Sequence, residues 1–375
     1  MKKHAIDLNG KTILVTGSPG FIGAFLVLRL LHDLTGGTVI SLDNMNDYYD
    51  PALKEYRLRL IEEAAKSAKA NHVFIRGSIA DKALIDKVFA DYHPQIVVNL
   101  AAQAGVRYSI DHPDTYIESN LIGFYNILEA CRHNPVEHLV YASSSSVYGG
   151  NKKVPFSVED MVDHPVSLYA ATKKSNELLA HSYSKLYNIP STGLRFFTVY
   201  GPAGRPDMFY FSATDKLSRG ETIQIFNYGD MRRDFTYVDD IVEGILRVMA
   251  GTPEKADGPD GLPLPPYAVY NIGGGTPENL LDFISVLQEE LVAAGVTVGL
   301  RLRRPPCPGG YAARRRARHL CRQPGSGGGL RLHPPHPHPG GPAPLRPVVS
   351  GLLRPLTAAF KRERERETRE SVTHA

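Results

Sequence analysis

The stretch Gly17-Ser18-Pro19-Gly20-Phe21-Ile22-Gly23 decides the fold of this chain. It joins a short β-branched run, Lys11–Thr16, to a segment with helical apolar spacing, Phe21–Leu34. The first glycine permits a tight turn, the second lets the backbone approach a pyrophosphate, and the third allows the helix to pack closely on the strand. The start of the helix would supply free N–H groups and a positive dipole end for phosphate. A glycine pattern alone also fits an ordinary structural turn.

Short apolar runs alternate with helical segments along the first 300 residues. The further runs are Thr38–Leu42, Val73–Arg76, Ile96–Leu100 and Leu139–Ala142. Helical spacing is found in stretches such as Asp81–Tyr92, Ile117–Arg132 and Ser167–Tyr187. Strands that are separated by helical crossovers predict an α/β fold, a doubly wound, Rossmann-like parallel sheet with helices on both faces. We expect the later segments to form a smaller C-terminal substrate lobe.

Asp43 stands at the end of the second expected strand, 20 residues beyond Gly23. A carboxylate at this place can accept hydrogen bonds from both ribose hydroxyls and repel a 2′-phosphate, which favours NAD over NADP. Taken alone, Asp43 could equally be a turn residue at a strand end. Combined with the glycine stretch, it predicts a dinucleotide-binding domain that takes NAD.

Tyr169 and Lys173 are four residues apart within the expected helix, so both side chains share one face. An ammonium near a phenol favours the phenolate and lowers the phenol pKa from about 10. A phenol tuned in this way can serve as general base or acid. Most Tyr–Lys pairs at this spacing form a solvated helix face, but downstream of a dinucleotide fingerprint this pair predicts catalysis.

The serine-rich stretch Ser143–Gly149 follows the apolar run that ends near Ala142. The carboxyl ends of strands face the ligand crevice in such sheets. A hydroxyl there can hydrogen-bond a substrate hydroxyl and the phenol together. Taken alone, the stretch also fits a plain serine-rich loop.

Composition excludes several classes of protein. The chain has 375 residues, of which 42% are hydrophobic and 22% charged, so it is neither fibrous nor disordered as a whole. It contains no apolar run of about 18 residues, which predicts no membrane-spanning helix. The polar N-terminus does not look like a signal peptide. Cys131, Cys307 and Cys321 lack paired spacing, so we expect no disulfide, no metal site and a cytoplasmic location.

The composition changes at about residue 296. Residues 301–375 contain 16 Lys and Arg but only 4 Glu, a net charge of +12, whereas residues 1–300 carry −8. A polyanion-binding arm, a disordered extension and a reading-frame error in a GC-rich gene all fit such a tail. The frame error is favoured, because shifted GC-rich codons tend to encode Arg, Pro, Gly, Ala and His. Only Tyr311 interleaves the arginines, so we expect no nucleic-acid partner.

Several motifs recur together. They are the glycine stretch, Asn99–Ala104, Ser143–Gly149, Tyr169–Lys173, Leu194–Met208 and Arg233–Asp240. As a set they resemble the extended short-chain dehydrogenase/reductase superfamily, and within it the NAD-dependent nucleotide-sugar epimerases, most closely the UDP-glucuronate 4-epimerases. The resemblance covers about residues 10–296.

The resemblance implies roles for individual residues. It implies catalytic roles for Ser144, Tyr169 and Lys173. It implies NAD contacts at Gly17, Gly20, Phe21, Ile22, Gly23, Asp43, Ser78, Ile79, Leu100, Ala101, Ala102, Tyr169 and Lys173. Substrate residues by resemblance are Ser145, Thr198 and Arg205 (the last two near the sugar carboxylate), Arg233 near the diphosphate, and Asn120 in a positioning segment.

Two departures from the family pattern stand out. Ser78 replaces an Asp that the family usually places near adenine. The family's C-terminal segment beside the uridine is missing, since the match decays after Gly295. We expect an NAD-binding domain at 1–198 with returning segments near 233–250 and 268–272, a substrate lobe at 199–232 and 273–296, and an unfolded tail at 297–375.

The expected activity is 4-epimerisation of UDP-glucuronate through a transient 4-keto sugar. A 4,6-dehydratase is disfavoured because Ser145 and Ser146 occupy the positions where such enzymes carry an acid pair. A UDP-glucuronate decarboxylase, another 4-epimerase, or an NAD-binding protein impaired by the missing segment remain alternatives. The resemblance also implies a UDP-sugar as the partner and a homodimer, with Ile85–Tyr92, Ile117–Arg132 and Asn176–Leu186 as candidate pairing helices.

Overall fold

The computed structural model describes residues 3–221, 223–225, 232–258, 261–275, 277–293 and 302–303. These residues fall into two compact units. The first unit runs to Phe197 and resumes from Val238 to Gly275, and the second contains Thr198–Tyr237 and the described residues after Thr276. The first unit therefore resumes five residues later than the returning segment expected near 233. The expected tail at 297–375 lies outside the described residues except for Leu302–Arg303, which form a short strand.

A seven-stranded parallel sheet forms the centre of the first unit, in the order β14-β7-β6-β5-β2-β3-β4. Its strands are β2 (Thr12–Thr16), β3 (Thr38–Asp43), β4 (Asn71–Arg76), β5 (Ile96–Asn99), β6 (His138–Ser144), β7 (Ser191–Phe196) and β14 (Tyr267–Ile272). From β2 the chain first builds outward through β3 and β4, and then from β5 in the other direction. The strand order reverses between β2 and β5, which is where doubly wound sheets bind ligands. The expected Rossmann-like α/β fold is confirmed.

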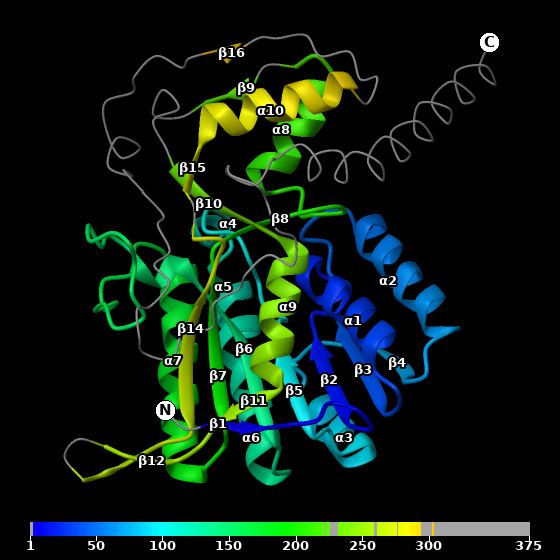
Figure 1. Ribbon diagram of the computed structural model, residues 1–375, viewed down its shortest axis with the longest axis vertical. Helices are drawn as coiled ribbons and strands as arrows, with labels where there is room; N and C mark the ends of the chain where they lie inside the picture. The colour runs from blue at the N-terminus through cyan, green and yellow to red at the C-terminus, as the bar shows by residue number, and fades with distance from the viewer. Residues whose placement is uncertain are drawn as a thin grey trace, which may run out of the picture. The chain divides into compact units, whose positions relative to one another are not determined.

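Helices pack as two groups on the two faces of this sheet (Figure 1). In one group α1 (Phe21–Asp33) packs against α2 (Pro51–Ala65) and α9 (Val238–Met249). In the other α6 (Gly123–His133) packs against α3 (Lys82–Tyr92) and α7 (Leu168–Tyr187). Strands β2, β5 and β6 are buried along almost their whole length. Cover on both faces explains why they read as continuous apolar runs rather than as alternating ones.

The helix expected over Ile117–Arg132 is interrupted. Ile117–Ile122 form a π-helical turn, η1, and α6 begins only at Gly123. Two short helices, α4 (Tyr108–Asp111) and α5 (Pro113–Tyr116), precede this turn. A π turn widens the helix and alters its backbone hydrogen bonds, and such turns occur often at functional sites.

The remaining short elements of the first unit lie outside the main sheet. β1 (Lys3–Ala5) pairs with β11 (Gly251–Pro253), and β12 (Ala256–Asp257) pairs with β13 (Pro263–Leu264). A 3-10 turn, η2 (Ser145–Tyr148), follows β6 directly. No helix in the described part of the chain combines the length and the apolarity that a membrane crossing requires.

The second unit has its own sheet and core. Strand β10 (Arg232–Tyr237) runs parallel to β8 (Thr198–Tyr200) and antiparallel to β15 (Pro277–Asn279). β9 (Ile223–Gln224) pairs with β16 (Leu302–Arg303). Helices α8 (Phe209–Ser218) and α10 (Leu280–Ala293) supply most of a buried apolar cluster, which includes Tyr210, Leu217, Phe283 and Leu287.

Candidate active site

The glycine stretch turns tightly between β2 and α1. Gly17 has φ +72°, and a Cβ on it would lie 2.7 Å from the Ala101 amide nitrogen at the end of β5. A Cβ on Gly20 would lie 2.8 Å, and one on Gly23 only 2.2 Å, from the Gly17 carbonyl oxygen. Each of these glycines therefore has a steric reason in the backbone around it.

The start of α1 is suited to an anion. Gly20 is the residue that caps the helix; its first turn contains no acidic residue and receives no side-chain cap. The free N–H groups and the positive end of the helix dipole are thus left for a ligand, and a phosphate group satisfies both. The loop fits the pyrophosphate of NAD, as the sequence predicts.

Asp43 ends β3 and is nearly buried. Its Oδ1 accepts hydrogen bonds from the Met45 amide at 2.7 Å and from Lys54 Nζ at 3.3 Å. Lys54 also donates to Asn46 Oδ1 at 2.6 Å. The carboxylate is therefore held at the strand end by a buried cation rather than turned out to solvent.

Cations on α2 were not identified from the sequence. Besides Lys54, Arg57 is 1% exposed and donates from NH1 to the Pro19 carbonyl within the glycine stretch, at 3.1 Å, and to Tyr49 Oη at 2.7 Å. Two cations spaced i, i+3 on the helix that follows Asp43 are the signal that could have revealed them.

The other predicted cofactor residues lie at the same sheet edge. Ser78 follows β4, and its Oγ accepts a hydrogen bond from the Ala80 amide at 3.1 Å. The side chain of Ile79 is packed in the buried core beside Gly123, so it supports this sheet edge by packing. The amides of Leu100 and Ala101 donate to Thr16 O and Thr16 Oγ1, both at 3.2 Å, and Ala102 follows them.

These residues are brought together by strand order. Along the edge the structure places Leu100–Ala102 after β5, Gly17–Gly23 after β2, Asp43 on β3 and Ser78–Ile79 after β4. This edge runs across four neighbouring strands and passes the point where strand order reverses. Because a dinucleotide is an extended ligand, such a continuous edge fits it.

The predicted catalytic residues lie at the next strand end. Ser144 is the last residue of β6; its Oγ accepts from the Ser146 amide and donates to Ser146 Oγ, both at 3.1 Å. Helix α7 starts one residue before Tyr169, where Ser167 Oγ accepts from the Ala170 amide at 3.1 Å. α7 packs against β6 and η2, and η2 contains Ser145.

Lys173 anchors α7 to β6. Its side chain is buried, and Nζ donates to the Ala142 carbonyl at 2.9 Å, two residues before Ser144. Burial lowers the pKa of Lys173 from 10.5 to about 8. The Tyr169 ring stands edge-on to the Tyr116 ring, with centroids 6.0 Å apart.

Replacing Lys173 with Met is expected to raise thermal stability at pH 7 while lowering kcat by about 100-fold. Below pH 8 both folded and unfolded chains carry the proton, so the wild type bears the cost of a buried ammonium. Between pH 8 and 10.5 the unfolded chain binds more protons than the folded one, so wild-type stability rises and the advantage of the variant shrinks.

The same variant is expected to move the acid limb of the pH–rate profile to higher pH, because the resemblance gives Lys173 the role of the cation that favours the ionised form of the Tyr169 phenol. Melting curves from pH 6 to 10 and rates over the same range test both effects. A variant that melts lower than wild type at pH 7 and keeps its rate would contradict this account.

Asn120 supports the site from within. It lies in η1 and is 1% exposed; its Oδ1 accepts from the Gln103 amide at 2.8 Å. Its Nδ2 donates to the Gln103 carbonyl and to Thr172 Oγ1, both at 3.1 Å. The Asn120 carbonyl accepts from Asn176 Nδ2 at 2.6 Å. Asn120 thus ties the loop after β5 to α7 on either side of Lys173, which fits a positioning role.

Three predicted substrate residues lie in the second unit. Thr198 begins β8, and Arg233 lies on β10, opposite Glu278 of β15. Arg205 forms a bidentate pair with Asp207, with Nε–Oδ1 at 2.9 Å and NH2–Oδ2 at 2.6 Å. The guanidinium of Arg205 therefore binds the Asp207 carboxylate through two parallel hydrogen bonds.

A buried ion pair beside the predicted catalytic residues was not identified from the sequence. Glu177 on α7 and Arg195 on β7 form it, and both are 3% exposed. Glu177 lies one turn beyond Lys173 and two turns beyond Tyr169 on the same helix face, and this i, i+4, i+8 series is the signal that could have revealed it.

Comparisons with known proteins agree with this geometry. Residues 13–273 match the NAD dependent epimerase/dehydratase family. Over 285 residues the chain is 52% identical to Protein CapI of Staphylococcus aureus, covering 74% of this chain and 83% of that protein. It is 47% identical over 289 residues to UDP-glucuronate 4-epimerase 4 of Arabidopsis thaliana, covering 76% of this chain and 64% of that protein.

A solved structure has the same fold. It is the UDP-glucuronic acid 4-epimerase from Bacillus cereus in complex with UDP-glucuronic acid and NAD, with a TM-score of 0.67 and 30% identity. The likeness covers 83% of this chain and 90% of that one. The family match spans well over half of the chain and includes the glycine stretch, Asp43 and the Tyr169–Lys173 pair. This chain belongs to the NAD dependent epimerase/dehydratase family.

Proposed function

We propose that this enzyme interconverts UDP-glucuronate and UDP-galacturonate through a transient 4-keto sugar. One observation supports the proposal: Lys173 of α7 donates to Ala142 of β6, two residues before Ser144, and Tyr169 lies one helical turn before Lys173 on the same face. The Bacillus cereus relative, which was solved with UDP-glucuronic acid and NAD, supports the choice of substrate and cofactor.

Each residue has a role in the proposed reaction. Ser144 hydrogen-bonds the sugar 4-hydroxyl, and the Tyr169 phenolate takes its proton. The ammonium of Lys173 favours that phenolate. When bound, NAD supplies the hydride acceptor at C4 and, after reduction, the hydride donor. Tyr169 returns the proton to the oxygen after the keto sugar has presented its opposite face, so one proton and one hydride leave and both return.

The sugar carboxylate needs separate control. A 4-keto uronate is a β-keto acid and loses CO₂ unless its carboxylate is held out of the reactive geometry. We propose that Arg205 holds it, with Thr198 adding a hydroxyl donor, and that Arg233 binds the diphosphate. The chemistry of the guanidinium supports this role, since it binds a carboxylate through two parallel hydrogen bonds. Asp207 holds these two donors in the structure, so the substrate carboxylate would take its place.

Replacing Arg205 with Ala is expected to raise KM for UDP-glucuronate by about 10- to 100-fold, the loss of a charge-assisted bidentate contact, or to release UDP-pentose. Product analysis by NMR measures both effects. Arg219→Ala is the matched control, because Arg219 in the same unit forms an exposed pair with Asp215 at 2.7 Å. Wild-type kinetics without pentose would exclude Arg205 from carboxylate binding.

The reaction itself is tested by incubating the purified chain with UDP-glucuronate and resolving the products. UDP-galacturonate supports the epimerase. UDP-pentose as the main product would identify a decarboxylase instead. No turnover by a folded, NAD-loaded chain would leave the family intact and identify an NAD-binding protein without this activity.

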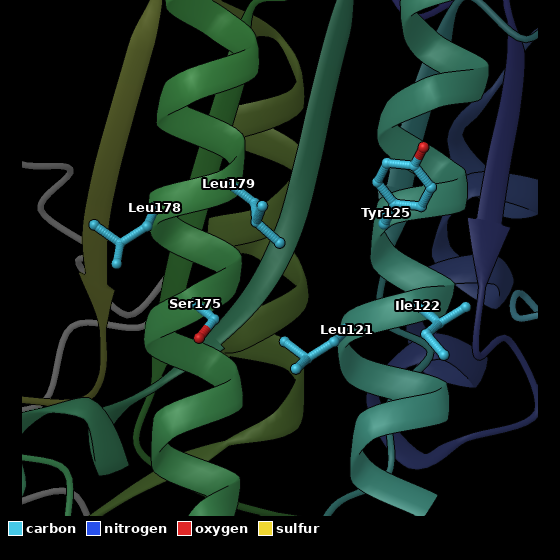
Figure 2. Close-up of a pocket in the computed structure, with 6 residues that line it drawn as sticks. All are labelled: Leu121, Ile122, Tyr125, Ser175, Leu178 and Leu179. Atoms are coloured by element: carbon cyan, nitrogen blue, oxygen red, sulfur yellow. The ribbon is translucent and has the colours of Figure 1, made fainter.

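We also propose that two copies pair through the face formed by η1, α6 and α7. A cavity of about 490 Å³ lies open on this face, and Figure 2 shows the side chains that line it: Leu121, Ile122, Tyr125, Ser175, Leu178 and Leu179. Ile122, Tyr125 and Leu178 are 48%, 44% and 59% exposed. A second copy covers such a face with the same face, as twofold symmetry requires.

Light scattering tests this pairing. A wild-type dimer that becomes a monomer in Leu178→Lys supports it, and a wild-type monomer overturns it. We also propose a cytoplasmic location, because the spacing of Cys131, Cys307 and Cys321 in the sequence does not suggest a disulfide framework.

A further inference from the structure

A buried polar network lies directly behind Ser144. Arg195 forms a bidentate ion pair with Glu177, in which Nε donates to Oε1 and NH2 donates to Oε2, each at 2.8 Å. Ser143 Oγ donates to the same Glu177 Oε1 at 2.7 Å. Ser143 and Arg195 are direct neighbours across the β6–β7 pair. The ion pair is thus bonded to the residue that immediately precedes the predicted catalytic serine.

The network also reaches η2. Arg195 NH1 donates to Tyr148 Oη at 3.0 Å, and Tyr148 Oη donates to Asn271 Oδ1 at 2.7 Å. The guanidinium stands 4.9 Å from the centre of the Tyr148 ring, which stacks on Phe156. Arg195 therefore holds the far end of the turn that begins after Ser144.

Stability alone does not account for this arrangement. Burial by itself would raise the pKa of Glu177, but the hydrogen bonds and charge of Arg195 hold it below its usual range. A buried ion pair of this kind contributes little net stability, and apolar residues of the same size often do better. Arg195 NH1 also bonds the Val158 carbonyl at 3.4 Å, and Lys174 Nζ donates to Glu177 Oε2 at 3.5 Å. The shorter bonds of the pair, to Ser143 and Tyr148, reach the residues on either side of Ser144–Val147.

We propose that Glu177 and Arg195 are positioning residues that hold the end of β6 and the turn η2 against α7, so that Ser144 keeps its place relative to Tyr169 and Lys173. Lys173 donates a hydrogen bond to the Ala142 carbonyl, and Glu177 accepts one from the Ser143 hydroxyl. Two successive turns of α7 are thus hydrogen-bonded to two successive residues of β6. A misplacement of about 1 Å between reacting groups lowers a rate by about 100-fold. This inference rests on the function proposed above.

Ser143→Ala removes one hydroxyl and leaves the ion pair in place. We expect kcat to fall about tenfold or more while KM changes less than about twofold and NAD stays bound, since only the serine's placement is disturbed. Ser191→Ala is the matched control: Ser191 is a fully buried serine at the opposite end of β7, bonded to the Ile189 carbonyl at 3.1 Å. It should keep the wild-type kcat.

Tyr148→Phe tests the other end of the network. It should likewise lower kcat while KM stays nearly unchanged. Hydrogen exchange over residues 143–149 reads the positioning directly, without turnover. We expect faster exchange there in Ser143→Ala and Tyr148→Phe, and not in Ser191→Ala.

The outcomes separate the two proposals. Wild type that does not turn over UDP-glucuronate would overturn the proposed function, and hydrogen exchange would still decide the positioning role. Folded Ser143→Ala and Tyr148→Phe variants with wild-type kcat and unchanged exchange over 143–149 would overturn the positioning role alone.

Discussion

Replacing Tyr169 with Phe is expected to lower kcat for UDP-glucuronate by about 10²- to 10⁴-fold, with NAD still bound and KM little changed. The change removes the O–H that we propose exchanges the substrate proton, and it keeps the ring that stands against Tyr116. The rate of the chemical step should therefore fall, while the binding of NAD and of UDP-glucuronate is retained.

Conversion followed by NMR, together with the ratio of NAD to protein after desalting, measures both quantities. Tyr183→Phe is the matched control. Tyr183 lies on the same helix and donates its hydroxyl proton to Glu129 Oε1 at 2.7 Å, far along α7 from the strand end. It should retain the wild-type kcat. A Tyr169→Phe variant within tenfold of wild type would remove Tyr169 from the role of base.

Replacing Gly23 with Ala is expected to weaken NAD binding strongly and to lower thermal stability. The added methyl group would stand 2.2 Å from the Gly17 carbonyl oxygen and 2.9 Å from Ser18 Cα, which is backbone that cannot yield without moving the loop. Overpacking of this kind costs about 1–3 kcal/mol. The displaced loop also loses the geometry that faces the pyrophosphate, so NAD affinity should fall by about 100-fold or more.

Gly36→Ala provides the control for this substitution. A Cβ on Gly36 would meet nothing within 4 Å, so this variant should melt and bind NAD as the wild type does. Calorimetric titration with NAD and thermal melting compare the pair. If Gly23→Ala binds NAD with wild-type affinity, the close packing of α1 on the loop does not shape the cofactor site.

Short-range sterics and periodicity are the properties of this protein that can be predicted most directly from its sequence. The turn at Gly17 must be glycine because a Cβ would meet the backbone of Ala101, and the spacing of glycines records that constraint in one stretch. Tyr169 and Lys173 share a face because helical geometry follows from local spacing. Buried parallel strands are readable as apolar runs because both of their faces are covered.

Strand β7 could not be predicted in this way. It is buried throughout, yet its sequence, Ser191–Phe196, includes two hydroxyl residues and Arg195, and it does not stand out as an apolar run. A charge is tolerated there only because Glu177 meets it from α7, 18 residues earlier in the chain. The π turn at Ile117–Ile122 was likewise hidden, since nothing in its apolar spacing differs from that of an α-helix.

By itself the sequence determined the class of fold, the glycine turn, the carboxylate at Asp43 and the pairing of Tyr169 with Lys173, because each depends on residues close together in the chain. Only the tertiary structure decided which side chains support them: Lys54 at Asp43, Asn120 between Gln103 and Thr172, and Arg195 with Glu177 behind Ser143. These contacts join segments that strand order and register bring together. No local pattern encodes a distance between such segments, so the hydrogen bonds that hold the site emerge only when the sheet has formed.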